Sequence, residues 1–371
     1  MNFDYNEEQR LLADSIRRFI AKDYGFEARR KIVASREGYS PAAWETFAGI
    51  GLLGLPFSSD YGGFGGGALD MMSVMEAIGE GLMVEPYLST VGLAAQLVAR
   101  GATQAQKEKI LPQVIEGKLR MAFAHTEEGA RYDLAHVALR ATKSAAGYVL
   151  DGEKRVVLHA PMAGQLVVSA RTEKGISLFL VDPKSPGITL KPYRTLDELR
   201  AADIAFKGVN VPAAALIGTE GGALPLIEEV TDYATALLCA EAVGALKFAN
   251  DTTLEYLKTR KQFGVPIGAF QALQHRMVDM VISYEQAKSM ASLACARIDA
   301  EKNPAERKRV ISAAKIRVAD ACRHVSQEAV QLHGGMGMSE ELKVSHTFRR
   351  LTVIMDQFGG ADYHLARFAS L

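Results

Sequence analysis

The stretch Arg260-Lys261-Gln262-Phe263-Gly264-Val265-Pro266-Ile267-Gly268-Ala269-Phe270-Gln271 separates two long helical patterns and decides the fold. Before it, residues 236–259 are apolar, rich in alanine and free of proline. After it, apolar side chains recur every three or four residues from Met277 to Ile298, which is the spacing of an amphipathic helix. The glycines and the proline inside the stretch disfavour helix. We therefore predict a short, shaped connection between two helices.

A second motif, Gln331-Leu332-His333-Gly334-Gly335-Met336-Gly337, follows the next helical pattern. That pattern opens at Asn303-Pro304, where asparagine is a favoured N-cap and proline is favoured in the first turn. We predict a helix that starts there and runs to His333, just before the paired glycines.

These two motifs, R-x-x-F-G and Q-x-x-G-G-x-G in this order, resemble those of the acyl-CoA dehydrogenase family, flavoenzymes that oxidise acyl-CoA thioesters to 2-enoyl-CoA. The resemblance implies that FAD is the cofactor and that these residues contact the FAD of a neighbouring subunit. The residues it assigns to FAD binding are Arg260, Phe263, Phe270, Gln271, Gln331, Gly334 and Gly335. Arginine offers a forked cation to a pyrophosphate, and glycine leaves the backbone free of side chains.

Composition narrows the class of protein. The 371 residues are enough for two or three domains with a large core. Lys plus Arg and Asp plus Glu both number 43, so no net charge attracts nucleic acid or an anionic membrane. The three cysteines lack metal-like spacing and predict reduced thiols. With neither a signal-like N-terminus nor a long apolar run, we expect a cytoplasmic protein without a metal site.

The sequence patterns predict a helical part, then a β part, then a second helical part. We expect a helical domain over residues 1–118, in which Thr103 and Gln106 predict a capping box, short strands over 119–219, and helices over 220–371. The dipeptide Asp151-Gly152 predicts a β-hairpin. The middle part is a small β-barrel or sandwich. The resemblance implies an α+β fold with an N-terminal helical domain, a middle β-barrel domain and a C-terminal four-helix bundle.

The desaturation of a thioester needs a base for the α proton and an oxidised flavin to accept hydride from the β carbon. A carboxylate in a dry pocket suits the base, because burial raises its pKa. The resemblance implies a glutamate at one of two positions. One lies before the last helix, where this chain has Gly359, and the other lies 26 residues before Arg260, where it has Ala234. Neither position carries a carboxylate.

Glu241 is the nearest replacement for the missing base. It lies seven residues after Ala234 on the same helix face, about 10 Å further along at roughly 1.5 Å per residue. A carboxylate inside an apolar helix is costly to bury unless it is paired. Glu241 is therefore either the catalytic base or one half of a buried ion pair, and we favour the pair.

The strand that faces the flavin in the family is altered here. The family pattern Thr-Glu-Pro-x-Ala-Gly-Ser-Asp corresponds to Thr126-Glu127-Glu128-Gly129-Ala130-Arg131-Tyr132-Asp133. Thr126 matches and is expected to contact FAD, but bulky Arg131 and Tyr132 replace glycine and serine. Val156 and Leu158 replace the family's Trp-x-Thr. The chain's own flavin pocket therefore differs from the family pattern, whereas the residues expected to contact the FAD of a neighbouring subunit match it.

Three hypotheses follow. In the first, the chain resembles the small subunits of two-subunit bacterial members that act on a dicarboxylic acyl-CoA. A paralogous larger subunit, in a heterotetramer, then holds the flavin ring and the base, and an electron-transfer flavoprotein is the acceptor. In the second, a self-sufficient homo-oligomer uses Glu241 as its base. In the third, the chain is a non-catalytic scaffold without flavin. Arg131 and Arg155 either meet a distal carboxylate of the substrate or are solvated surface arginines.

Overall fold

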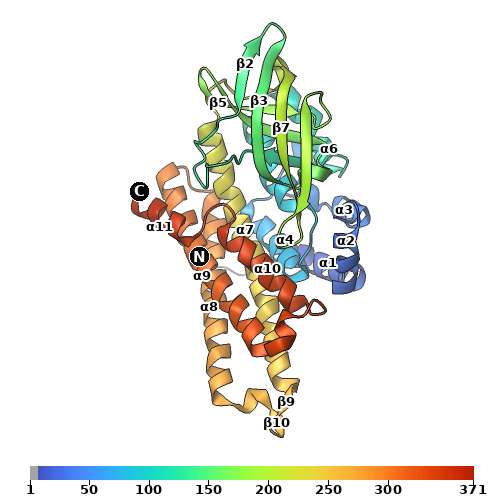
Figure 1. Cartoon of the computed structure of the whole chain (residues 1–371), viewed down its shortest axis with the longest axis vertical. Helices are drawn as coiled ribbons and strands as arrows, with labels where there is room; N and C mark the ends of the chain where they lie inside the picture. Colours follow the sequence, from blue (N-terminus) through green and yellow to red (C-terminus); the bar gives the residue numbers. More distant parts are fainter. Residues whose placement is uncertain (1–6) are drawn as a thin grey trace. The chain divides into compact units, whose positions relative to one another are not determined.

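The computed structural model describes residues 7–371 and is drawn in Figure 1. The N-terminal residues that we expected to carry no targeting signal lie outside the described part. The chain folds into two compact units. The helical unit comprises residues up to Lys31 with 68–83 and 235–371, and the mixed unit comprises 32–67 and 84–234.

The mixed unit begins with short helices. Helix α2 (Phe26–Ala34) enters it at residue 32. The other helical segments are α3 (Pro41–Gly49), a π-helical segment η3 (Leu88–Ala94), α5 (Ala95–Gly101) and α6 (Gln104–Ile115). The predicted capping box before α6 is confirmed, because Thr103 Oγ1 accepts from Gln106 N and Gln106 Oε1 accepts from Thr103 N.

The sheet of the mixed unit is open. Its order is β6-β7-β3-β2-β4-β5-β8, with β1 paired to β4. The strands are β1 (Met121–Ala124), β2 (Arg140–Ser144), β3 (Gly147–Leu158), β4 (Gln165–Thr172), β5 (Gly175–Val181), β6 (Ile188–Arg194), β7 (Arg200–Pro212) and β8 (Leu216–Ile217). The expected closed barrel is therefore wrong for the described strands. One edge strand, β8, has two residues, and the other, β6, contains Pro192, which has no N–H to donate.

The hairpin that we predicted at Asp151-Gly152 is also wrong. Strand β3 continues through both residues, and its pairing with β7 shifts register between Leu150 and Gly152, as in a β-bulge. The Asp151 carboxylate accepts a hydrogen bond of 2.7 Å from Gly208 N. The turn lies earlier, between Ser144 and Gly147, where β2 and β3 pair. Gly152 therefore lies at a β-bulge and not in a turn.

The helical unit contains α1 (Glu7–Asp23), α4 (Ala68–Gly81), α8 (Gln271–Ile298), α9 (Pro304–His333), α10 (Lys343–Asp356) and α11 (Ala361–Ala369), with α7 (Leu224–Thr259) entering from the mixed unit. The predicted α9 is confirmed from end to end, and Asn303 Oδ1 caps it by accepting from Ala305 N at 2.9 Å. Helix α9 packs against α8, α10 and α11. Among the described residues, the short α11 adds a fifth helix to the four expected in the C-terminal part.

Two glycines bring helices α4 and α7 into backbone contact. A Cβ on Gly79 would lie 1.9 Å from Glu241 O, and one on Gly244 would lie 1.8 Å from Glu76 O. Only glycine permits this approach. The crossing fixes the segment of α7 that carries Glu241. No helix in the described part of the chain is both long and apolar enough to span a membrane.

Candidate cofactor and catalytic sites

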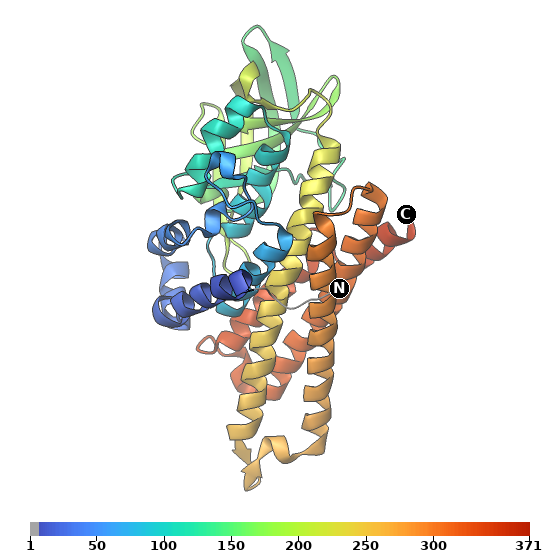
Figure 2. The same cartoon turned by 180° about the vertical axis from the view of Figure 1, so that it is seen from behind.

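The connection between α7 and α8 contains a β-hairpin with a two-residue turn. Strands β9 (Lys261–Gln262) and β10 (Val265–Pro266) pair on either side of Phe263 and Gly264. Both turn residues have left-handed backbone, with φ of 54° and 82°, as a type I′ turn requires. Phe263 is 91% exposed. Its ring meets Phe270 edge to face, with 6.1 Å between centroids. Figure 2 shows this hairpin at the far end of the α7–α8 pair.

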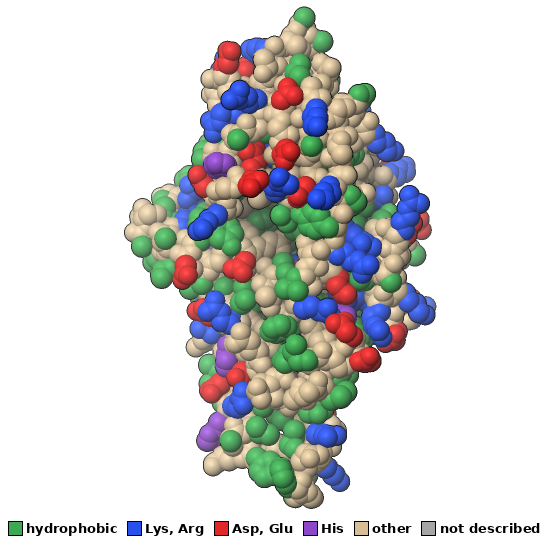
Figure 3. Space-filling view, viewed as in Figure 1, with side chains coloured by type: hydrophobic (Ala, Val, Ile, Leu, Met, Phe, Trp, Pro, Cys, Tyr) green, Lys and Arg blue, Asp and Glu red, His purple; other side chains and the backbone are tan. Residues whose placement is uncertain are grey.

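Exposed apolar side chains continue from the hairpin along α8. Val265, Val278, Val281 and Ile282 each expose 40% or more of their surface. Hydrophobic side chains gather at this end of the molecule in the space-filling view of Figure 3. Contiguous exposed apolar surface of this kind often marks a site of interaction with a protein or a ligand.

Arg260 lies between the end of α7 and the first strand of this hairpin. Its backbone N–H donates to Tyr256 O, and its carbonyl accepts from Ile267 N, both at 2.8 Å. The side chain is exposed, and its guanidinium has no hydrogen-bond or ion-pair partner among residues 7–371. Gln271, the first residue of α8, is exposed beside Phe270. Of the predicted FAD contacts, four therefore lie together on an open surface.

The remaining predicted contacts of the helical unit lie where α9 ends. Gln331, Gly334 and Gly335 are exposed. Gly334 has φ of 59° and ψ of −142°, a conformation that side chains disfavour. A Cβ on Gly334 or on Gly335 would meet nothing within 4 Å. The turn therefore presents bare backbone outward, which fits close approach by a nucleotide.

An aromatic stack joins the two motifs. The rings of Tyr256 and His333 lie 4.4 Å apart between centroids and 28° from parallel. His333 is buried, and its Nδ1–H donates to Ala329 O at 2.8 Å. Burial lowers the pKa of His333, and this hydrogen bond partly opposes the shift. Because Tyr256 belongs to the last turn of α7 and His333 to the last turn of α9, the structure brings the two motifs together.

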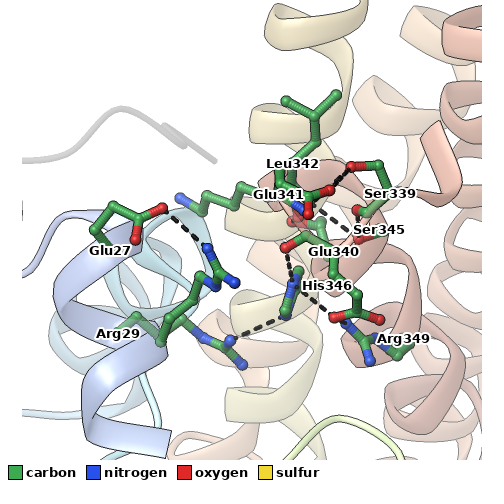
Figure 4. Close-up of polar contacts among 12 residues, drawn as sticks. Glu27, Arg29, Ser339, Glu340, Glu341, Leu342, Ser345, His346 and Arg349 are labelled. Atoms are coloured by element: carbon green, nitrogen blue, oxygen red, sulfur yellow. Dashed lines mark hydrogen bonds and ion pairs between the residues drawn. The ribbon is translucent and has the colours of Figure 1, made fainter. Parts of the chain in front are cut away.

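The segment after the glycine turn is held by a polar cluster, drawn in Figure 4. His346 of α10 lies between Arg29, whose guanidinium is 3.3 Å from Nδ1, and Glu340 O, 3.1 Å from Nε2. Because a guanidinium only donates, Nδ1 accepts and Nε2 carries the proton. Ser345 Oγ donates to Ser339 O at 2.7 Å. These contacts fix residues 339–342 between the glycine turn and α10.

Glu241 is paired with a buried arginine. Both of its carboxylate oxygens accept from Arg350 of α10, at 2.6 Å from Nε and 2.8 Å from Nη2. Both side chains are buried. Arg350 Nη1 also lies 3.5 Å from Gln357 Oε1. The pair therefore connects α7 to the turn that contains Gly359.

The turn at Gly359 has no room for a side chain. Gly359 has φ of 118°, and a Cβ there would lie 2.4 Å from Tyr363 and 2.8 Å from His364. Buried Lys315 donates to Ile354 O and Met355 O at 2.6 and 2.9 Å. His364 contacts Phe358 O at 3.2 Å. The other family position, Ala234, is fully buried on α7.

The altered strand belongs to the mixed unit. Thr126 is exposed, and Arg131 is exposed with φ of 48°. Buried Glu127 accepts from fully buried Lys154 at 2.7 Å and from the backbone of Leu139 at 3.0 Å. The Lys154 Nζ also donates to Ser169 Oγ at 2.9 Å. Burial lowers the pKa of Lys154 to about 8, against the opposing influence of Glu127. This buried pair fixes the start of the segment between β1 and β2, which contains Arg131.

Val156 and Arg155 lie at the edge of this strand. Val156 has φ of 50°, which is rare for a β-branched residue, and is half exposed. Its N–H donates to Asp203 Oδ1 at 3.1 Å. Arg155 forms ion pairs with Asp203 at 2.9 Å, and with Glu128 and Glu153. Carboxylates of the protein therefore already surround the guanidinium of Arg155.

Sequence reasoning missed Arg350 and Lys154. Arg350 lies beside Arg349 in an amphipathic helix, where a charged side chain is expected to face the solvent. Lys154 lies in β3, where alternation along the strand is the one signal that could have placed its side chain inward. Neither partner is near in sequence. In the described part of the chain, no group of three or more His, Cys, Asp or Glu side chains is arranged to hold a metal ion.

Profiles of one protein family match most of the chain. The acyl-CoA dehydrogenase N-terminal domain matches residues 6–118, the middle domain matches 122–209, and the C-terminal domain matches 224–367. The short-chain-specific acyl-CoA dehydrogenase of Megasphaera elsdenii is 30% identical over 348 residues, covering 89% of this chain and 90% of that protein.

Solved structures agree in fold. A chain of the ChsE4–ChsE5 complex from Mycobacterium tuberculosis superposes with a TM-score of 0.91 at 25% identity, covering 100% of this chain and 98% of that chain. The FAD complex of PigA superposes with a TM-score of 0.91 at 26% identity, with the same coverage of 100% and 98%.

Proposed function

Because this chain belongs to the acyl-CoA dehydrogenase family, we propose that it is one subunit of a heteromeric, FAD-dependent acyl-CoA dehydrogenase whose larger, paralogous chain supplies the catalytic base. Enzymes of this family are oxidoreductases that act on the CH–CH group of acyl-CoA thioesters with FAD. The observation that carries the division of labour is the state of the base positions. Gly359 has no room for a side chain, Ala234 has no carboxylate, and Glu241 is bound to Arg350.

The residues of the helical unit fit the adenosine-diphosphate end of FAD. Arg260 offers a guanidinium without a partner within the described chain, and Gly334 and Gly335 offer open backbone. Phe263 offers an exposed aromatic face at a strained turn position. Phe270, Gln271 and Gln331 complete the set that we assign to FAD binding. FAD supplies the hydride acceptor when bound, and this chain's residues would hold its pyrophosphate and adenosine.

Residues of the mixed unit also support the proposal. Thr126 remains as a hydroxyl for FAD, but Arg131 and Val156 occupy positions where the family has smaller or aromatic residues. Both adopt positive φ and are exposed. We therefore propose that this chain completes a flavin site held by another chain and does not build a full one. The ChsE4–ChsE5 complex is a relative with two components, which supports a heteromeric assembly.

The most specific part of the proposal is the identity of the acyl group of the substrate. The resemblance to two-subunit members that act on a dicarboxylic acyl-CoA makes such a thioester the first substrate to test. Arg131 remains available for a distal carboxylate, whereas Arg155 is engaged by three carboxylates. An electron-transfer flavoprotein is the proposed acceptor. Three buried free cysteines support a cytoplasmic location.

The test measures flavin absorbance of the chain purified alone and after co-expression with a paralogous chain from its own genome. We expect a colourless single chain and a yellow complex that bleaches with acyl-CoA. Arg260→Ala should lower the flavin content of the complex, and Lys258→Ala, which removes an equal charge two residues away, should not. A single chain that binds flavin and bleaches would overturn the division of labour and favour a homo-oligomer with its own base.

A further inference from the structure

The Tyr256–His333 stack joins the helix ends that carry the two motifs, yet neither residue is among the FAD contacts assigned above. We propose that Tyr256 and His333 are positioning residues that couple Arg260 to the glycine turn, so that both motifs reach one nucleotide in a fixed relation. This inference rests on the proposed function and deepens it.

The stack is coupled to Arg260 through the backbone of α7. Tyr256 O accepts the hydrogen bond from Arg260 N at 2.8 Å, so movement of Tyr256 moves the residue from which the guanidinium extends. The hairpin is tied to the same point, because Ile267 N donates to Arg260 O at 2.8 Å. Gly268 also packs on α7, where a Cβ would lie 2.9 Å from Leu257 O.

The stack is coupled to the glycine turn through His333. Gly334 follows His333 directly and turns the chain with left-handed backbone, and its N–H donates to Gln331 O. The hydrogen bond from His333 Nδ1 to Ala329 O fixes both the tautomer and the plane of the ring. With 4.4 Å between centroids and 28° between planes, the two rings make a broad contact. A rotation of either ring would break it.

Contacts with α10 hold the far side of the glycine turn, so the stack is the contact that links the turn to α7. The residues after the glycine turn are held by Ser345 on Ser339 and by His346 on Glu340. The turn is therefore anchored to α10 at one end and to α7 through the stack at the other. Preorganised groups bind a ligand more tightly because less freedom is lost on binding.

The experiment separates the ring contact from the hydrogen bond. Tyr256→Phe keeps the ring and Tyr256→Leu removes it. His333→Asn keeps an N–H donor near Nδ1 but removes the ring, and His333→Phe keeps a ring but removes the donor. The FAD dissociation constant of the purified oligomer is measured by flavin fluorescence, together with the melting temperature. We expect Tyr256→Phe to bind as the natural chain does, and Tyr256→Leu and His333→Asn to bind FAD about tenfold more weakly.

A double variant distinguishes positioning from simple support of the fold. In the Arg260→Ala background, Tyr256→Leu should weaken FAD binding by less than about twofold, because the group that it positions is gone. Full additivity, or a lower melting temperature with an unchanged dissociation constant in both Tyr256→Leu and His333→Asn, would overturn the inference and leave the proposed function standing. Unchanged FAD binding in Arg260→Ala itself would overturn both.

Discussion

Both carboxylate oxygens of Glu241 bind the guanidinium of Arg350, at 2.6 and 2.8 Å, across the packed helices α7 and α10. A bidentate pair of this kind uses the lone pairs that a general base needs for its substrate. Arg350 also reaches Gln357, so the pair fixes the turn at which the family carries its base. The geometry favours a structural role for Glu241.

Glu241→Gln should therefore destabilise the protein without removing its activity. The neutral amide removes the charge that Glu241 presents to buried Arg350, which we expect to cost about 3 kcal/mol of unfolding free energy. Urea denaturation measures that loss, and turnover of the folded complex should stay within about threefold, well short of the 10²–10⁴-fold contribution of a general base. The double variant Glu241→Met with Arg350→Met, which removes both charges of this pair, should recover part of that stability. Loss of turnover in a folded Glu241→Gln complex would make Glu241 the base.

Gly359 should not accept a restored base. In Gly359→Glu the new Cβ meets the ring of Tyr363 at 2.4 Å and the backbone keeps φ of 118°, so the turn must move. We expect a loss of at least about 2 kcal/mol from strain and overpacking, in Gly359→Ala as well. Gly25→Ala is the matched control, because nothing lies within 4 Å of its Cβ. Thermal unfolding measures both, and a stable, active Gly359→Glu chain without partner would contradict this account.

Local chemistry decided which parts of the fold the sequence could predict. Helix α9 starts after Asn303 and ends at His333 as expected, because its cap and its glycine stop act within a few residues. The break between α7 and α8 also follows from local preference, through Gly264 and Pro266, but the positive φ of Phe263 runs against it. The dipeptide Asp151-Gly152 misled, because the same preference serves a bulge when β7 pairs across it. Closure of the sheet depends on whether its two edge strands, β6 and β8, pair with each other, which their own local patterns do not determine.

The candidate site was predictable only where it follows a motif. Arg260, Gly334 and their neighbours are identified by resemblance, but their proximity depends on the Tyr256–His333 contact between two helices. Glu241 was recognised as half of a pair or a base. Its partner, Arg350, is 109 residues away in the chain. Pairing over such a distance depends on tertiary packing, which sequence spacing does not reveal.

Acid should destabilise the protein in part through His364. Burial, with Lys315 and Arg367 nearby, lowers the pKa of His364 from 6.5 to about 3. The unfolded chain therefore binds a proton at this residue between about pH 6.5 and pH 3 that the folded chain does not bind. Unfolding free energy must fall as pH falls through that window, by roughly 1.4 kcal/mol per pH unit for this residue.

Denaturant titrations at pH 7 and pH 5 test this expectation. The loss of unfolding free energy between the two values should be about 2 kcal/mol smaller in His364→Gln than in the natural chain. His125, whose pKa burial also lowers to about 3, remains in both proteins and serves as the common background. Equal losses in the two proteins would mean that His364 does not differ in protonation between the folded and unfolded states.

Phe263 should show a conflict between stability and cofactor binding. Its left-handed backbone costs a non-glycine residue roughly 1–2 kcal/mol, and its ring, 91% exposed, regains little by packing on Phe270. Phe263→Asn creates the Asn-Gly pair that type I′ turns prefer. We expect its unfolding free energy to be unchanged or raised, while the complex binds FAD more weakly because the aromatic face is lost.

Two measurements on one pair of variants decide whether this strained residue is retained for binding. Val265→Thr, on the adjacent strand, keeps the hairpin and Phe263 and should leave both properties close to those of the natural chain. If Phe263→Asn lowers the unfolding free energy and leaves the FAD dissociation constant unchanged, the ring acts within its own chain, and its exposure has no role in the cofactor site. The opposite pattern is the one expected of a side chain that contacts a nucleotide held by another subunit, because strained backbone is concentrated at sites where it contributes to binding.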